Sequence, residues 1–369
     1  MKGGSQKILV RGVNWLGDAV MTTPALQRLR EAKPGAEIVL LTHEKLADLW
    51  RDQPVVDSIR TFSSGESAWS IGKKLRAEKF DVGLAFPNSH RSAIELWLAG
   101  IPHRIGYAHS LRNFFLTQPV PPHPVLVKMR KRSGAEIKRL VAGLNPVAPM
   151  AIPAQAHHIH QYLHLVGTLG ANTEPLAPHL EISQREVANF QRRVAEISGN
   201  ENPFWLGLNP GAEYGPAKRW LPERFVEAAL QIHQQTGCGW IIFGGKDSAT
   251  QIVAAELEKK LDQKNVANFA GKTTLRELCA GLKYCRLVLT NDTGPMHIAA
   301  ALGTPIVVPF GSTSPELTGP TPSKRNVVLQ SNVPCSPCFL RECPIDFRCM
   351  KSIETSEVVR SCLSLLKIM

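Results

Sequence analysis

The stretch from Leu287 to Ser312, LVLTNDTGPMHIAAALGTPIVVPFGS, constrains the fold of this chain more than any other part of it. Two short apolar runs flank a polar turn and a helix of small residues, which we expect from about Pro295 to Leu302 with Gly303 as its stop. Short apolar runs on either side of a helix are typical of a parallel βαβ unit. The stretch therefore predicts an α/β protein with a parallel sheet.

The polar turn in this stretch consists of Asn291, Asp292, Thr293 and Gly294. It places an acid, a hydroxyl and backbone N–H groups at a helix start, where the helix dipole and the unpaired donors favour phosphate. Such a turn at the carboxyl end of a sheet predicts a site for a nucleotide diphosphate. The alternative is that Asp292 and Thr293 only cap the helix, which is the usual role of these residue types.

A second strand-to-helix junction opens the chain. Ile8 to Val10 form a predicted strand that leads through Gly12 and Gly17 to Asp18, and a helix is expected from Ala19 to about Lys33. The glycines lack the G-x-G-x-x-G spacing of a dinucleotide-binding fingerprint. Asp18 lies where open α/β sheets expose their working residues. It could cap the helix, or it could accept a proton from a bound hydroxyl.

Glycine-containing loops follow four successive predicted strands in the second half of the chain. The first contains Lys218 and Arg219, which could contact an anion, and the second contains Gly245 and Asp247. Because the ends of parallel strands meet at one edge, we expect one nucleotide-sized ligand to lie across these loops. The four loops span 209–220, 244–247, 271–273 and 291–294.

The charge of the chain points to an anionic partner. Its 369 residues include 43 Lys and Arg against 31 Asp and Glu, a formal net charge of +12. Nucleic acid, acidic lipid and a phosphorylated glycan would all satisfy this balance. A basic region with few acids is expected to form an anion-binding rim on the first domain. It includes Arg104, His109, Arg112, Lys128, Arg130, Lys131 and Arg132.

Length and hydropathy favour a two-domain protein that is cytoplasmic. The chain is too long for one ordinary core, no apolar run reaches membrane-spanning length, and the start MKGGSQKILV lacks a signal-peptide core. We expect one domain over 1–175, a second over 183–350, and a C-terminal helix over 351–369 that packs on one of them. Residues 173–178, with two prolines, resemble a linker.

Four of the eight cysteines crowd into the C-terminal segment CSPCFLRECPIDFRCM, which begins at Cys335. In a cytoplasmic chain this crowding indicates thiols or a metal before it indicates disulfides. Cys335 and Cys338 have the spacing of metal ligands, but Cys343 and Cys349 are too far apart for the paired C-x-x-C of a zinc ribbon. We therefore expect no metal and no cofactor, and metal binding by the four thiols stays an open alternative.

These motifs together resemble a known family. VRGVNWLGDAVMTTPAL near the N-terminus, NPGAEYGPAKRW in the middle, LTNDTGPMHIAAALGTPIVVPFG, and the cysteine segment look like the lipopolysaccharide heptosyltransferases of glycosyltransferase family nine. The resemblance spans about Lys7 to Val359. Relatives often carry a His near the position of Phe347, and this departure further reduces the expectation of a metal.

The resemblance implies a GT-B fold, in which two Rossmann-like domains with parallel sheets face a central cleft. It implies an inverting glycosyltransferase that moves a heptose from ADP-heptose to the phosphorylated lipid A–Kdo inner core of lipopolysaccharide, at the inner face of the inner membrane and without a required metal. By motif matching, Asp18 corresponds to the general base and Lys218 to a lysine on the donor phosphates.

The expected binding residues follow from the same motifs and from the basic region. The acceptor is expected to contact arginines of the basic region and the helix before it, namely Arg91, Arg104, Arg112 and Arg130. The donor is expected to contact the strand-end loops and the helix after the polar turn, namely Asn209, Gly211, Gly245, Asp247, Asp292, Thr293, Gly294 and His297.

Two other functions were weighed against this one. A related glycosyltransferase could use another nucleotide sugar or another glycan acceptor. A nucleic-acid-binding protein would also explain the positive charge, but the basic residues lack interleaved stacking aromatics and any recognised nucleic-acid-binding signature. We therefore expect no nucleic acid among the partners.

Overall fold

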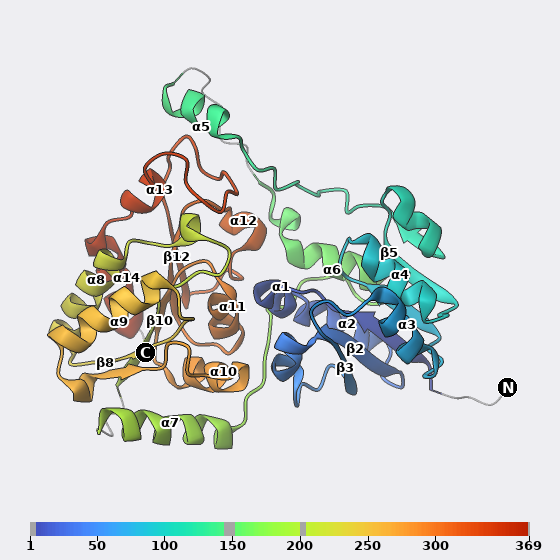
Figure 1. Cartoon of the computed structure of the whole chain (residues 1–369), viewed down its shortest axis with the longest axis horizontal. Coiled ribbons are helices and arrows are strands. Elements are labelled where there is room, and N and C mark those ends of the chain that lie inside the picture. Colours follow the sequence, from blue (N-terminus) through green and yellow to red (C-terminus); the bar gives the residue numbers. More distant parts are fainter. Residues whose placement is uncertain (1–4, 144–151, 200–203, 368–369) are drawn as a thin grey trace. The chain divides into compact units, whose positions relative to one another are not determined.

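The computed structural model of the chain describes residues 5–143, 152–199 and 204–367. It divides into two compact units, and Figure 1 labels their helices and strands. Unit 1 comprises 1–126 and 155–181, and unit 2 comprises 127–154 and 182–369. The segment 127–154 thus groups with unit 2, whereas the sequence suggested one boundary near residue 175.

Unit 1 is built on a parallel sheet of six strands in the order β3-β2-β1-β4-β5-β6. Its strands are β1 (Lys7–Arg11), β2 (Glu37–His43), β3 (Ser58–Phe62), β4 (Val82–Ala85), β5 (His103–Tyr107) and β6 (Gln118–Val120). Its helices are α1 (Leu16–Met21), α2 (Thr23–Ala32), η1 (Glu44–Trp50), α3 (Ala68–Arg76), α4 (His90–Leu98), η2 (Ser110–Phe115), η3 (Ala154–Ala156, which straddles the unit boundary) and α6 (His158–Gly167).

Unit 2 contains a second parallel sheet of six strands, in the order β12-β11-β10-β7-β8-β9. Its strands are β7 (Trp205–Asn209), β8 (Gly239–Ile242), β9 (Val266–Asn268), β10 (Val288–Thr290), β11 (Ile306–Phe310) and β12 (Asn326–Gln330). Its helices are α5 (Gly134–Val141), α7 (Gln184–Ser198), η4 (Pro216–Lys218), α8 (Pro222–Thr236), α9 (Ser248–Lys260), η5 (Gln263–Asn265), α10 (Leu275–Tyr284), α11 (Gly294–Ala301), α12 (Pro315–Thr318), α13 (Arg348–Lys351) and α14 (Thr355–Lys367).

Both sheets have the doubly wound Rossmann order. In each unit the first three strands run outward on one side and the next three on the other, so the order reverses between β1 and β4 and between β10 and β7. Ligands of open α/β sheets bind at the carboxyl ends of the strands that flank this reversal. The loops after these four strands are therefore the places to look for function.

The central strands are buried because helices cover them. All five residues of β7 and all five of β11 are buried, as expected of apolar strands in a parallel sheet. In unit 2 the core extends to Val358, Cys362 and Leu365 of α14, which packs against α8 (Figure 1). The apolar runs seen in the sequence are thus the cores of the two sheets.

The first helix of the chain is interrupted, whereas the sequence suggested one helix from Ala19 to about Lys33. Thr22 separates α1 from α2, and its hydroxyl donates to the carbonyl oxygen of Ala19 at 2.7 Å. The Thr23 hydroxyl donates to Val20 O at 2.8 Å, in place of the N–H that Pro24 lacks. The threonine hydroxyls and Pro24 together explain why the helix is divided here.

Residues 173–181 belong to unit 1 and lie against it. The N–H of His179 donates to Thr23 Oγ1 at 3.1 Å, and the Gln53 side chain exchanges hydrogen bonds with the backbone of Glu181 at 2.8 and 2.9 Å. These contacts hold the end of the unit 1 chain against α2 and against the loop after η1. A prolyl segment that looks like a linker is therefore fixed by backbone hydrogen bonds to unit 1.

Candidate active site

Asp18 lies in the first turn of α1, directly after the loop that follows β1. The residue that caps this helix is Trp15, so Asp18 occupies the third helical position and not the capping position. The side chain is half-buried. Burial raises the pKa of the Tyr162 phenol well above its usual value, and the negative charge of Asp18 contributes to this rise. A carboxylate and a buried tyrosine of α6 therefore lie near each other at the β1 switch point.

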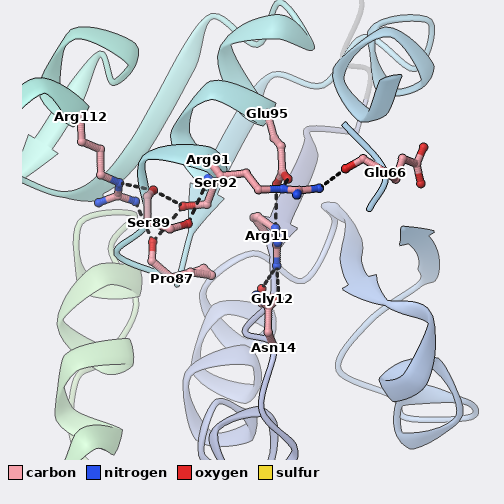
Figure 2. A network of polar contacts seen from close by, with 10 residues as sticks. All are labelled: Arg11, Gly12, Asn14, Glu66, Pro87, Ser89, Arg91, Ser92, Glu95 and Arg112. Carbon is pink, nitrogen blue, oxygen red and sulfur yellow. Dashed lines mark hydrogen bonds and ion pairs between the residues drawn. The ribbon is translucent and has the colours of Figure 1, made fainter. Parts of the chain in front are cut away.

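A buried ion pair supports the loop that leads to Asp18. Arg11, the last residue of β1, is 2% exposed, and its Nε donates to Glu95 Oε2 at 2.8 Å (Figure 2). Its Nη1 donates to the Gly12 carbonyl and to Asn14 Oδ1, the latter at 2.9 Å. The guanidinium also lies 4.3 Å from the ring centre of Phe62. Arg11 thus connects the first loop of the switch point to α4.

The second loop of the switch point, after β4, is held by Arg112. Its guanidinium is fully buried and donates to the carbonyls of Pro87 and Ser89 (Figure 2). It also donates to the carbonyl of Tyr107. Burial lowers its pKa to about 10, so it stays protonated at neutral pH. Because these donors are directed at backbone carbonyls, Arg112 shapes this loop from inside the unit.

The other three arginines expected at the acceptor have different surroundings. Arg91 is 43% exposed and donates to Glu95 Oε1 at 2.7 Å and to the Glu66 carbonyl. Arg104 is half-buried and donates to the carbonyls of Phe115 and Ile101. Arg130 belongs to unit 2, where it pairs with Glu136. Arg91, Arg104 and Arg112 thus share unit 1, and Arg130 lies outside it.

In unit 2 an ion pair lies at the end of β10. Lys218 Nζ is 2.6 Å from Asp292 Oδ2, and the same oxygen accepts a 2.6 Å hydrogen bond from Thr313 Oγ1. Asp292 is 3% exposed, and the ammonium of Lys218 also lies 5.1 Å from the ring centre of Tyr214. The loops after β7, β10 and β11 therefore meet at one carboxylate.

The capping alternative for the polar turn is not what the structure shows. Thr293 is the N-cap of α11, but its side chain makes no capping hydrogen bond. Its hydroxyl instead accepts from Asn209 Nδ2 at 3.2 Å, and the same amide donates to Thr290 Oγ1 at 3.0 Å. Asn291 is buried and bonds Pro210 O across the two loops. The turn is thus cross-linked to the loop after β7.

The glycine loops after β7 and β8 approach each other closely. A Cβ on Gly211 would lie 2.6 Å from Asp247 Oδ2 and 2.8 Å from Thr250 Oγ1, so a larger residue there would displace these side chains. Asp247 is the N-cap of α9 and accepts from the backbone N–H of Thr250 at 3.2 Å and from its hydroxyl at 2.7 Å. Gly245 lies in the same exposed loop, between β8 and α9. Asp247 thus caps α9, in addition to the contact with the sugar-nucleotide donor that the sequence predicted for it.

The remaining donor residues belong to α11. Gly294 is its first residue, and His297 is 6% exposed within the helix. The carboxyl ends of β7 and β10 bring these two residues together with five others expected at the donor, namely Asn209, Gly211, Lys218, Asp292 and Thr293. Thr313 and Tyr214 were missed from the sequence, although Thr313 directly follows the Gly311-Ser312 end of an apolar run, a position that could have signalled it.

Comparison with known proteins agrees with this architecture. Two doubly wound units with parallel six-stranded sheets are typical of the GT-B class of glycosyltransferases. A solved structure titled E. coli ADP-heptose lps heptosyltransferase II matches 98% of this chain and 99% of its own. Its TM-score is 0.76 and its sequence is 26% identical. The model of glycosyltransferase family 9 (heptosyltransferase) matches residues 68–129 and 123–347. The chain belongs to glycosyltransferase family 9.

Curated relatives agree with this assignment. Lipopolysaccharide heptosyltransferase 2 of Escherichia coli K12 is 30% identical over 331 residues, which cover 87% of each chain. Lipooligosaccharide heptosyltransferase 2 of Haemophilus ducreyi is 30% identical over 337 residues, which cover 88% of each chain. The family, the GT-B fold and the enzyme class expected from the motifs are thereby confirmed, and a glycosyltransferase is favoured over a nucleic-acid-binding protein.

Proposed function

We propose that this enzyme transfers a heptose from ADP-heptose to the phosphorylated inner core of lipopolysaccharide, with inversion at the anomeric carbon. The observation that carries the proposal is the match, over nearly the whole chain, to proteins named heptosyltransferase 2 or II. The geometry at both switch points supports it. The required chemistry is a base for the attacking hydroxyl and positive charge for the departing diphosphate.

The donor would lie on unit 2, across the ends of β7 and β10. Lys218 would contact the diphosphate, and the N-terminal end of α11 at Gly294 would add backbone donors and a favourable dipole. Asp292 would accept hydrogen bonds from heptose hydroxyls, because a second negative charge next to a diphosphate would repel it. The rest of the donor-binding site would be formed by Asn209, Gly211, Thr293 and His297. The ribose would lie beside Gly245 and Asp247.

The acceptor would lie on unit 1, with Asp18 as the general base. Asp18 lies in the first turn of α1, after the loop that follows β1, and its half-buried position would let a substrate hydroxyl reach its carboxylate. Arg91 and Arg104 would offer charge to core phosphates, whereas Arg112 would act by holding the Pro87 to Ser89 loop. Arg130 would have to reach the acceptor from unit 2.

We further propose that the enzyme works in the cytoplasm, at the inner face of the inner membrane. No helix within the described residues is long and apolar enough to span a bilayer. Two side chains of η2, Leu111 and Phe114, are 79% and 81% exposed, and an apolar tip on a basic protein suits a surface of anionic lipid. Changing both to serine should reduce sedimentation with phosphatidylglycerol vesicles, and equal sedimentation would contradict the contact.

A transfer assay tests the proposed reaction. Purified enzyme, ADP-heptose and a set of truncated cores should give a product one heptose heavier with one core. Asp18→Asn should lower kcat by about 10²- to 10⁴-fold, the usual contribution of a general base, with ADP affinity unchanged. Near-normal turnover in Asp18→Asn would refute the base assignment.

Thermal protection by free nucleotides tests the donor class separately. ADP should raise the melting temperature more than UDP or GDP at equal concentration. Stronger protection by UDP would indicate a relative that uses another nucleotide sugar, even if Asp18→Asn behaves as expected.

A further inference from the structure

A tryptophan occupies the N-cap position of the helix that carries Asp18. The backbone of Trp15 is extended and its carbonyl oxygen accepts from the N–H of Ala19 at 2.8 Å, but its side chain makes no capping hydrogen bond. N-cap positions favour Ser, Thr, Asp and Asn, because their side chains accept from a free N–H of the first turn. The stability of α1 therefore does not account for a tryptophan at this position.

The indole of Trp15 is 48% exposed. Trp69 and Trp97 of unit 1 are exposed to a similar degree, and each has a partner. Lys73 Nζ lies 5.1 Å from the ring centre of Trp69, and the ring of Phe115 lies 5.6 Å from that of Trp97. Within 5–143, 152–199 and 204–367, Trp15 contacts neither another ring nor a cation. About half of this large apolar side chain is therefore open to a ligand.

The loop before Trp15 is held in place by the strands of unit 1. The N–H of Gly12 donates to Leu41 O of β2 at 2.9 Å, and Val13 is 7% exposed. Arg11 donates to the Gly12 carbonyl and is itself paired with Glu95 (Figure 2). The next two side chains along the chain are exposed. The buried ion pair thus supports a loop that presents both of them to solvent.

The first of these two side chains is an amide that Arg11 orients. Asn14 Oδ1 accepts from Arg11 Nη1 at 2.9 Å (Figure 2). Because a guanidinium can only donate, the amide oxygen must face Arg11, and the N–H donors of Asn14 Nδ2 point away from it. The exposed amide therefore offers a hydrogen-bond donor of fixed direction beside the indole.

Trp15 and Asp18 are neighbours at the start of α1. They occupy the N-cap and the third helical position. Side chains at these two positions lie close together, which is what allows a capping box to form in other helices. Asp18 is half-buried, whereas Trp15 is exposed. A ligand ring that covers the indole would therefore bring its hydroxyls to the carboxylate proposed as the base.

We propose that Trp15 and Asn14 bind the sugar ring of the acceptor that carries the attacking hydroxyl. The C–H groups on one face of the ring pack on the indole, because their partly positive hydrogens are attracted to the negative face of an aromatic ring. Asn14 Nδ2 donates to an oxygen of the same sugar. This inference rests on the proposed function, and it names the residues that recognise the acceptor as a sugar, separately from the arginines proposed for its phosphates.

Steady-state kinetics with the core that accepts heptose test the contact. Trp15→Ser should raise the KM for this core by about 10-fold, the loss expected from one stacked aromatic contact. The kcat should change much less, because the contact is present in both the bound substrate and the transition state. Trp69→Ala, at an exposed position on α3, is the matched control and should leave the KM unchanged. An unchanged KM in Trp15→Ser would overturn the inference.

The melting temperature of Trp15→Ser distinguishes binding from a structural role. Serine is a good N-cap residue, so the variant should melt at the same temperature as wild type or at a higher one. A raised KM together with a lower melting temperature would mean that Trp15 supports the loop, and would contradict the proposed contact.

Two conservative variants test the two contacts separately. Trp15→Tyr keeps an aromatic face and should have a KM within about threefold of wild type. Asn14→Asp keeps the oxygen that faces Arg11 but loses the donor, and should raise the KM by about 3- to 10-fold. If the KM of Trp15→Tyr were as high as that of Trp15→Ser, stacking would be excluded. An unchanged KM in Asn14→Asp would exclude the amide contact.

Oxidation of wild-type protein by N-bromosuccinimide, mapped by mass spectrometry, needs no variant. A saturating amount of the accepted core should protect Trp15 and leave the reactivity of Trp69 unchanged. If Trp15 were oxidised equally with and without the core, in protein that transfers heptose, the inference would fail and the proposed function would stand. If wild-type protein transferred heptose to none of the cores, both would fail.

Discussion

Lys218 Nζ lies 2.6 Å from Asp292 Oδ2, so the loop after β7 and the turn after β10 are joined by an ion pair at the switch point of unit 2. Asp292 is almost fully buried and Lys218 is 16% exposed. A lysine ammonium has three donors, of which one is directed at Asp292. The pair therefore holds the ammonium in place, and the proposed function assigns its other donors to the diphosphate of the donor.

The first prediction concerns this pair. Lys218→Met should weaken ADP binding by about 10- to 100-fold, because a hydrogen bond to a charged group contributes about 1.5–3 kcal/mol. Asp292→Asn should weaken ADP binding much less, because losing the ion pair with Lys218 is offset by the removal of a negative charge that would repel the diphosphate. Titration calorimetry with ADP measures both, with Lys260→Met on the exposed part of α9 as the control for lost charge. Equal ADP affinity in Lys218→Met and wild type would contradict the diphosphate role.

The second prediction concerns the Arg11–Glu95 pair in unit 1 (Figure 2). Both side chains are at most 2% exposed, and burial lowers the pKa of Arg11 while Glu95 opposes this effect. Glu95→Ala removes the carboxylate that neutralises the buried guanidinium of Arg11. It should lower the free energy of unfolding of unit 1 by about 3–5 kcal/mol in urea denaturation. Glu44→Gln, at an exposed position, should change stability by less than about 0.5 kcal/mol.

A double variant distinguishes loss of the pair from loss of packing. Arg11→Met/Glu95→Leu removes both charges and should be more stable than Glu95→Ala, because no buried charge is left without its partner. If the double variant were the less stable of the two, the cost would come from lost volume and not from the unpaired charge.

The strand ends were the most predictable part of this structure. Short apolar runs followed by glycine-containing loops located β7, β8, β9 and β10, because a buried parallel strand must be apolar and a tight strand end favours glycine. The same pattern located the Asp18 and Asp292 loops. Once the strands are placed, the handedness of βαβ units puts both loops at the carboxyl edge.

The pairing of side chains could not be predicted in this way. Arg112 and Arg91 look alike in the sequence, yet Arg112 is buried against carbonyls of Pro87 and Ser89, more than twenty residues away. Lys218 and Asp292 are likewise far apart along the chain, so their ion pair depends on the order β10-β7. Contacts between residues that are far apart along the chain cannot be predicted from the residues next to them in the sequence.

The third prediction is a pH dependence of stability. Two hydrogen bonds from Arg276, at 2.7 and 2.8 Å, are the main cause that lowers the pKa of Glu186 to about 2. The unfolded carboxyl titrates near 4.5, so between these pH values the unfolded state binds more protons. The stabilisation is therefore present above about pH 4.5 and is lost as the pH falls toward 2.

Glu186→Gln measures this contribution. The shift corresponds to about 3 kcal/mol, and we expect about 2 kcal/mol because the carboxylate is 28% exposed and partly screened. The difference from wild type in urea denaturation should shrink to about half between pH 7 and pH 3. Glu196→Gln, exposed on the same helix, should show no such trend. A difference that stays constant with pH would mean that packing, not charge, explains the loss.

The last prediction concerns the contact between α3 and α4, which carries the Arg91–Glu95 part of the network. A Cβ on Gly72 of α3 would lie 2.4 Å from Leu98 Cβ, closer than any real contact, and the backbone of Leu98 lies 3.1 Å away. Gly72→Ala gains up to about 1 kcal/mol of helix propensity, but the clash forces the helices apart and should cost about 1–3 kcal/mol. Gly35→Ala is the matched control, since a Cβ there meets no atom within 4 Å. Urea denaturation should show a clear net loss for Gly72→Ala and a change within about 0.5 kcal/mol for Gly35→Ala. If Gly72→Ala were as stable as wild type, the helices could separate without cost, and the network on α4 would be less rigid than its burial implies.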